Sequence, residues 1–340
     1  MTMNCLTRVT LAAALSLSAL GAQAAEVEWR LSHWLPATHP IQPQGIEPWA
    51  ESIKEASGGR INITIFPAQQ LGAAPDHYDM ARDGIADVTY VNPGYQAGRF
   101  PIASLIEIPF QVTNATDGAA AMHEWYAQYA EKEMPDVKVC MMNPHDPGAF
   151  HSKTPIHVPA DVSGMNVRPA NATIARFVSL LGGSSVQVSA PEAREALSKG
   201  VADAMTFPWN SVYLFGIDQI LHQHLDMPFY ASLQTLLISK ASYEALPDDL
   251  KTVIDDHCTP EWSKTFSTGW ADWEAAGRQK MIDSPDHTLY EPTDDEIALW
   301  REAAAPLLDS WKKDVTAKGY DADAIYQSYM DTLEKYGVKY

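Results

Sequence analysis

Apolar and polar residues follow two different periods along the first part of the chain, one typical of strands and the other of helices. Apolar, often β-branched side chains occupy alternate positions in three segments: 26–35, 60–66 and 86–91. This alternation predicts three strands. Between them, apolar residues recur at helical spacing over 46–53, and 76–83 predicts a second, short helix. Strands that alternate with helices predict a parallel sheet in an α/β domain.

One segment of this pattern occurs twice. A-P-D-H-Y-D-M-A-R-D-G-I-A-D (74–87) resembles A-P-E-A-R-E-A-L-S-K-G-V-A-D (190–203). In each copy a proline opens a helix, a glycine ends it and an aspartate leads into the next strand. The matched residues are Pro75 and Pro191, Gly84 and Gly200, and Asp87 and Asp203. Because every matched residue has a mechanical role, we interpret the segments as parts of two lobes of related design.

We therefore predict an α/β fold with two lobes, a ligand cleft between them and long C-terminal helices. Residues 25–145 are expected to form mainly the first lobe, and residues 146–240 mainly the second, including a strand at 233–239. Residues 241–340 are expected to be a helical segment that braces both lobes, with a bend at Pro306.

Residues 1–24 have the order of a secretory signal peptide. Arg8 is the only charge before Glu26, an apolar run covers 11–22, and small residues follow it. The run is too short to span a bilayer. We expect cleavage after Ala24, with no cysteine there to carry a lipid anchor, and a mature protein in the periplasm.

The charge of the chain excludes some partners. With 24 basic and 43 acidic residues, the formal net charge is −19, which repels nucleic acid and acidic lipid surfaces. Cys5 belongs to the expected signal peptide, so Cys140 and Cys258 remain. In an exported protein they are compatible with one disulfide or with two buried thiols, and the sequence leaves both open.

Arg168 is the central residue of the expected site. It ends a short strand-like run in D-V-S-G-M-N-V-R-P-A-N (161–171). Pro169 favours an extended conformation for Arg168, so its side chain points past the end of the strand. A guanidinium held in this way can donate two parallel hydrogen bonds to a carboxylate. A surface arginine on a strand is the simpler alternative.

Ligands of open α/β sheets bind beyond the carboxyl ends of the strands. The residues expected there are mostly aromatic or amide side chains, with one cation among them. For each ring, burial in the core is an equally good explanation. The candidate ligand-binding residues are Trp34, Asn92, Tyr95, Phe150, His151, Arg168, Asn171, Phe207 and Trp209.

No catalytic motif supports an enzyme. G-x-S-x-G, H-E-x-x-H, G-x-x-x-x-G-K and G-x-G-x-x-G are all missing from the sequence. His222 and His224 form an H-x-H pair, but no nearby acid or cysteine completes a set of metal ligands. We therefore predict no catalytic residue, no cofactor and no metal.

The motifs resemble those of the solute-binding proteins of TRAP (tripartite ATP-independent periplasmic) transporters. The resemblance is carried by G-R-I-N-I-T-I-F-P-A-Q-Q-L-G (59–72), the two G-I/V-A-D elements, and the block from Asp146 to Asn171. It implies a periplasmic-binding-protein-like fold, with strands crossing between two lobes and a long helix bracing both. It also implies an organic acid ligand held by Arg168, and delivery to a membrane permease driven by an ion gradient.

Departures from the family pattern bear on the ligand. Phe207 stands where many members have asparagine, and Trp34 where the residue is often small or polar. Some members that bind acidic sugars have a second arginine near the position of Phe150 and a charged residue near that of Tyr95, and this chain has rings at both. Fewer polar partners and more rings favour an aromatic monocarboxylate of the benzoate or arylacetate type.

In this interpretation Arg168 binds the carboxylate, with Asn171 and His151 as neighbouring donors. The ligand ring is enclosed by five side chains: Trp34, Tyr95, Phe150, Phe207 and Trp209. The alternatives are the same receptor for a small aliphatic 2-oxo acid or a dicarboxylate, and a periplasmic sensor or enzyme that acts on organic acids.

Overall fold

The computed structural model describes residues 25–340, so the expected signal peptide lies outside the described residues. The first of two sheets has the strand order β2-β1-β3-β10-β4. The bounds are β1 Val27–Ser32, β2 Ile61–Phe66, β3 Val88–Val91, β4 Val137–Pro144 and β10 Leu233–Ser239. β1 runs parallel to β2 and β3, as expected, whereas β10 is antiparallel to both β3 and β4. The sheet is therefore mixed.

The second sheet has the order β11-β9-β5-β8-β6-β7. Its strands are short: β5 Ala149–Ser152, β6 Asn166–Arg168, β7 Ser184–Ser185, β8 Ala204–Phe207, β9 Gln223–Leu225 and β11 Thr288–Tyr290. β6 is parallel to β7 and β8, and β5 is antiparallel to β8 and β9. Arg168, the last residue of β6, pairs with Met205 of the central strand β8.

Helices cover both sheets. The α-helices are α1 Glu47–Ala56, α2 His77–Arg82, α3 Ala115–Glu133, α4 Ala172–Leu180, α5 Ala190–Ser198, α6 Trp209–Leu214, α7 Lys240–Glu244, α8 Asp248–Asp256, α9 Pro260–Ile282, α10 Asp294–Ala317 and α11 Ala322–Lys335. Shorter helical turns are η1 Ile41–Ile46, η2 Ala74–Asp76, η3 Pro93–Tyr95, η4 Ala103–Glu107 and η5 Pro159–Val162. Most helices begin at a residue whose neighbours in sequence cap the helix. At α5, for example, Ser189 and Glu192 form a capping box.

The two copies of the repeat end in the same way, although the first forms the turn η2 and the helix α2 and the second forms the single helix α5. Gly84 ends α2 and Gly200 follows α5, both with φ near +70° (69° and 71°), which favours glycine. The side chain of Asp87 accepts a hydrogen bond from the Arg30 backbone N–H at 2.8 Å, and that of Asp203 accepts one from the Asn166 N–H at 3.1 Å. Each aspartate thus ties the start of its strand to the neighbouring strand.

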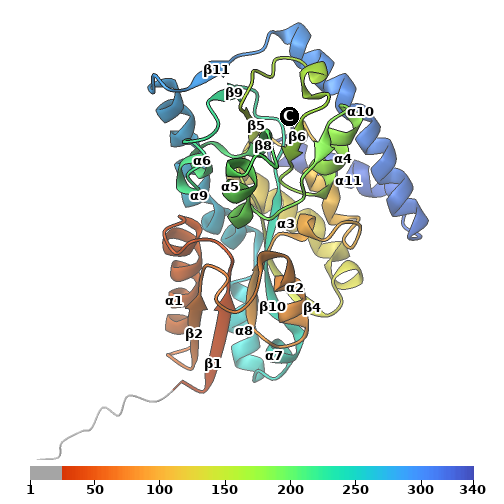
Figure 1. Ribbon diagram of the computed structural model, residues 1–340. Coiled ribbons are helices and arrows are strands. Elements are labelled where there is room, and N and C mark those ends of the chain that lie inside the picture. The colour runs from red at the N-terminus through yellow and green to blue at the C-terminus, as the bar shows by residue number, and fades with distance from the viewer. Residues whose placement is uncertain (1–24) are drawn as a thin grey trace, which may run out of the picture.

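The two sheets lie in separate halves of the molecule, the first sheet low and the second high in Figure 1. The chain passes from the first to the second between β4 and β5 and returns between β9 and β10. We expected the strand at 233–239 in the second lobe, and this was wrong: it is β10, which pairs with β3 and β4. The return of the chain places residues 232–234 at the junction.

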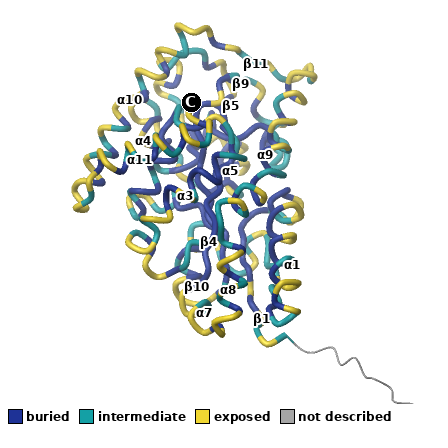
Figure 2. The backbone as a smooth tube through the Cα atoms, turned by 180° about the vertical axis from the view of Figure 1, so that it is seen from behind, coloured by how far each residue is buried: buried dark blue, intermediate teal, exposed yellow. Residues whose placement is uncertain are grey.

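Long helices hold the halves together. α9 packs against α3 and β4 of the first half and against α6 and β11 of the second. α10 contains Pro306 and packs on η4, η5 and α4. Buried segments, dark blue in Figure 2, run along the middle of both halves and through their junction. In the described part of the chain, no helix is both long and apolar enough to cross a membrane.

The two cysteines of the described chain form a disulfide. Cys140 of β4 is bonded to Cys258, which lies between α8 and α9, and their Cα atoms are 4.4 Å apart. Of the two alternatives left open by the sequence, the structure has the bonded one. The bond joins the first sheet to the segment that leads into α9.

Candidate functional site

A small cavity of about 30 Å³ lies where the two lobes meet. Its wall combines residues that follow β1 and β3, residues of β10, and residues that follow β6 and β8. Five of the nine candidate residues line it: Trp34, Asn92, Tyr95, Arg168 and Phe207. The remaining lining residues are Leu35, His39, His145, Ala170, Ala190, Pro208, Ser211, Phe215, Ser232, Gln234 and Trp270.

Arg168 is the only arginine or lysine among these lining residues, and it is 1% exposed. Its Nε donates to the carbonyl oxygen of Val188 at 3.0 Å, which fixes the plane of the guanidinium. Its Nη1 has no hydrogen-bond partner, and no carboxylate of residues 25–340 forms an ion pair with it. A buried cation without an anionic partner is costly, so this guanidinium is suited to an anion from outside the chain.

Aromatic side chains from both lobes surround the guanidinium. The guanidinium carbon of Arg168 lies 5.6 Å from the centre of the Phe207 ring. On the first lobe, Trp34 and Tyr95 pack edge to face with ring centres 5.8 Å apart. The cavity therefore joins one anion-binding group to flat apolar walls, an arrangement that suits an acid with a planar apolar body.

Direct hydrogen bonds link the lobes beside the cavity. The hydroxyl of Tyr95 accepts from the Ala190 backbone N–H at 3.0 Å, and Asn171 Nδ2 donates to Ser232 Oγ at 2.8 Å. Outside the lining of the cavity, Thr173 Oγ1 of the second lobe donates to Glu107 Oε2 of the first at 3.2 Å. The lobes are thus closed on each other in this structure.

The structure places Phe150 and Trp209 away from the cavity. Neighbouring residues of a strand point to opposite faces, and Phe150 of β5 faces the core, where it stacks on Phe229 with ring centres 5.1 Å apart. Trp209 opens α6 and packs edge to face against His151 at 5.2 Å. We expected both rings at the ligand, and both pack in the interior.

Asn171 also has a different position from the one we expected. Its Oδ1 accepts from the Ile174 N–H at 2.8 Å and caps α4, while its Nδ2 holds Ser232. It supports a wall residue and does not line the cavity.

His151 has no donor left for a ligand. Its Nε2 faces the Phe207 carbonyl oxygen at 3.0 Å and so carries the proton, and its Nδ1 lies 2.7 Å from Nδ1 of His224. Burial lowers the pKa of His151 to about 4, so the ring is neutral and Nδ1 accepts from His224. His224 Nε2 then accepts from Nδ1 of His287 at 2.9 Å. The expected donor is instead the inner end of a chain of three imidazoles.

The row of histidines formed by His151, His224 and His287 is not arranged as a metal centre. His287 approaches the H-x-H pair formed by His222 and His224, with the rings of His222 and His287 5.4 Å apart. Across residues 25–340, however, no group of three or more His, Cys, Asp or Glu side chains is placed to hold a metal ion.

Several lining residues carry no local sequence signal. His39 lies in the loop after β1, Trp270 in the middle of α9, and Ser232 and Gln234 at the start of β10. Trp270 has the helical spacing of a core residue, and β10 was assigned to the other lobe. The contacts between sheets that bring them together are not encoded in any single segment.

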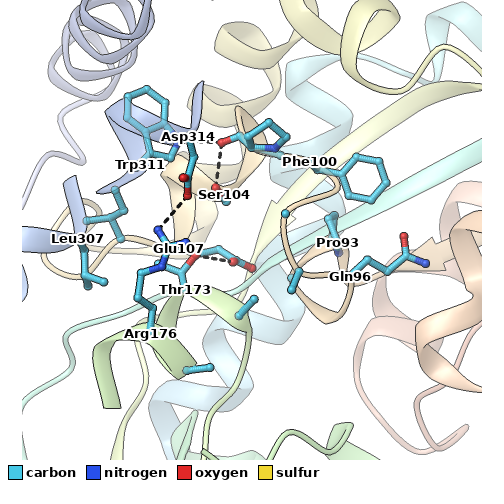
Figure 3. A pocket seen from close by; sticks show the side chains of 18 of the residues that line it. Pro93, Gln96, Phe100, Ser104, Glu107, Thr173, Arg176, Leu307, Trp311 and Asp314 are labelled. Carbon is cyan, nitrogen blue, oxygen red and sulfur yellow. Dashed lines mark hydrogen bonds and ion pairs between the residues drawn. The ribbon is translucent and has the colours of Figure 1, made fainter. Parts of the chain in front are cut away.

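A second, wider hollow of about 690 Å³ lies between η4, α4 and α10 (Figure 3). Arg176 and Asp314 point into it from α4 and α10 and form an ion pair at 2.9 Å. Glu107 and Thr173 form its floor, where they share the hydrogen bond between the lobes. The arginine of this hollow has a carboxylate partner and is half exposed, and its lysine, Lys318, is exposed, so the small cavity at Arg168 is the better anion site.

Two α/β lobes that close over a cavity are the architecture of a solute-binding protein. Residues 31–314 match the family model described as DctP, bacterial extracellular solute-binding protein, family 7, and the chain belongs to this family of TRAP transporter receptors. A curated solute-binding protein of Chromohalobacter salexigens is 23% identical over 75% of this chain and 77% of its own.

Three solved TRAP solute-binding proteins share the fold closely. One from Rhodoferax ferrireducens, in complex with copurified benzoate, is 29% identical with a TM-score of 0.86 over 92% of this chain and 98% of its own. A marine metagenome protein specific for aromatic acids, with 3-hydroxybenzoate, has the same identity and score over 92% and 99%. One from Bordetella bronchiseptica, with (R)- and (S)-mandelate, is 28% identical with a TM-score of 0.84 over 91% and 99%.

Proposed function

We propose that the protein is the extracytoplasmic receptor of a TRAP transporter and captures an aromatic monocarboxylate of the benzoate or arylacetate type. The carboxylate binds to Arg168, and the ring lies among Trp34, Tyr95 and Phe207. The observation that carries the proposal is the guanidinium of Arg168, which is buried, lacks a carboxylate partner in residues 25–340, and faces aromatic walls.

The charge of the cavity favours one carboxylate. Burial lowers the pKa of His39 to about 3 and that of His145 to about 4, so both lining histidines are neutral at pH 7. Arg168 is then the one formal positive charge among the lining residues. A second carboxylate would lose its hydration without meeting a cation, which disfavours dicarboxylates.

The cavity in this closed form is smaller than an aromatic acid, so binding requires the lobes to move. The space of about 30 Å³ lies among side chains that come from both lobes. A ligand reaches it when the lobes move apart, and contacts to both walls then favour the closed state. The bound acid is released to a membrane permease, and the receptor leaves its ligand chemically unchanged. The benzoate, 3-hydroxybenzoate and mandelate bound by the three related structures support this ligand class.

A thermal-shift screen of the mature protein against organic acids tests the proposal. At 100 times its dissociation constant, a ligand stabilises the form that binds it by about 2.7 kcal/mol. We expect benzoate or an arylacetate to raise the melting temperature and to be recovered unchanged after incubation. Stabilisation by aliphatic 2-oxo acids or dicarboxylates alone would contradict the proposed ligand class, and turnover of the acid would show an enzyme.

A further inference from the structure

We infer that the ligand carries a hydroxyl on its aromatic ring, at a position remote from the carboxylate, and that Gln234 and His39 of the first lobe recognise it. This inference rests on the proposed function, because it assigns the far end of a ligand whose carboxylate is held by Arg168. Gln234 and His39 would then determine specificity among aromatic acids.

Four buried polar atoms without a partner belong to residues that line the cavity. They are Trp34 Nε1, His39 Nε2, Arg168 Nη1 and Gln234 Oε1. The four residues are between 0% and 4% exposed, so bulk solvent does not reach these atoms. Buried polar groups in folded proteins are nearly always hydrogen-bonded, so four unpaired ones on residues around one cavity point to a ligand.

The donor or acceptor role of each atom follows from its surroundings. The Ile41 backbone N–H donates to His39 Nδ1 at 3.2 Å, so the proton of this neutral ring is on Nε2, which is a donor. Trp34 Nε1 and Arg168 Nη1 are donors by their chemistry. Gln234 presents an amide, which contains an acceptor and a donor in either orientation. A hydroxyl is the simple group that can accept from His39 and donate to Gln234.

These groups come from the two sheets that meet at the cavity. Arg168 ends β6 in the second sheet, whereas Gln234 is on β10 of the first sheet, and Trp34 and His39 follow β1 of that sheet. A carboxylate on Arg168 therefore directs the rest of the ligand towards Gln234 and His39. A hydroxyl at ring position 3 or 4 faces that wall, while a hydroxyl at position 2 stays beside the carboxylate.

Calorimetric titration with benzoate and its three monohydroxy isomers tests the inference. We expect 3- or 4-hydroxybenzoate to bind about tenfold more tightly than benzoate, as two net hydrogen bonds of ordinary strength would provide. 2-Hydroxybenzoate is the matched control and should gain no such advantage. If benzoate binds as tightly as the best hydroxy isomer, the inference is overturned while the proposed function stands. If neither these four acids nor an arylacetate binds, both fail.

Substitution of Gln234 tests whether this residue causes the preference for a hydroxylated ring. Gln234→Met keeps the length of the side chain and removes its amide, so the ratio of the benzoate to the hydroxybenzoate dissociation constant should fall at least about threefold. Gln327→Met changes an exposed glutamine of α11 and should leave that ratio at the wild-type value. A wild-type ratio in folded Gln234→Met, verified by its melting temperature, would overturn the role of Gln234.

Discussion

The guanidinium carbon of Arg168 lies 5.6 Å from the centre of the Phe207 ring, and both residues line the cavity between the lobes. A cation against the face of a ring is attracted by the ring's negative potential, and the contact also limits how the guanidinium can turn. The Nε bond to Val188 adds a second restraint. The terminal nitrogens are thereby oriented before any ligand arrives, which lowers the entropic cost of binding.

Substitutions of Arg168 should distinguish the contribution of its charge to ligand binding from that of its planar shape. We expect both Arg168→Ala and Arg168→Lys to weaken benzoate binding on the order of 100-fold or more, because an ammonium cannot bond Val188 and a carboxylate in the same plane. Titration calorimetry measures the loss. Arg176→Lys is the matched control, since Arg176 is half exposed and paired with Asp314. Normal binding by Arg168→Lys would mean that only the charge matters.

Glu107 should make stability depend on pH. Burial raises the pKa of Glu107 from 4.5 to about 8, so the folded state keeps a proton that the unfolded chain releases above about pH 4.5. Its contribution to the free energy of unfolding is therefore full below pH 4.5 and falls as pH rises towards 8.

Glu107→Gln preserves the neutral form and the bond from Thr173. We expect the variant to gain stability relative to wild type as pH rises from 5.5 to 8, measured by urea unfolding at several pH values. A stability difference that does not change with pH would show that Glu107 is ionised in the folded protein.

The disulfide between Cys140 and Cys258 spans a sequence separation of 118 residues. Closing so long a loop restricts the unfolded chain, and removing the bond should lower the free energy of unfolding by roughly 2–4 kcal/mol. Urea unfolding of Cys140→Ser/Cys258→Ser measures this loss. Dithiothreitol should shift the wild type and leave the double variant unchanged. Equal stability of the two oxidised proteins would contradict the prediction.

Gly277 allows α9 to approach the start of α6, which follows Phe207 in the chain. A Cβ at Gly277 would lie 2.3 Å from the backbone nitrogen of Asn210, whereas one at Gly118 of α3 would lie 3.1 Å from a methyl group of Val112. Because backbone cannot move aside as a side chain can, Gly277→Ala should destabilise the protein clearly more than Gly118→Ala, by about 1–3 kcal/mol. Similar melting temperatures of the two variants would show that α9 shifts without cost.

The sequence predicted the features that depend on local chemistry. The repeat of proline, glycine and aspartate is one case, since each residue acts within its own helix or strand ending. The place of Arg168 at the end of β6 is another, because Pro169 favours an extended backbone for the residue before it. The two-lobe α/β fold and the membership of the family are confirmed.

The sequence did not predict which segments far apart in the chain come into contact. β10 belongs to the first sheet because the chain returns antiparallel beside β3, and the apolar alternation of 233–239 says nothing about its neighbour. Phe150 and His151 are adjacent on one strand, so their side chains had to face different surroundings. Phe150 packs in the core against Phe229, whereas His151 contacts the Phe207 carbonyl oxygen and His224. Residue type at a strand end indicates a site, but not which face the side chain takes.

The most direct measurement is a side-by-side calorimetric titration of the mature protein with benzoate and succinate. One buried guanidinium facing aromatic walls predicts that benzoate binds at least about 100-fold more tightly, since the second carboxylate of succinate would be buried without a cation. Equal dissociation constants, or tighter binding of succinate, would contradict the account.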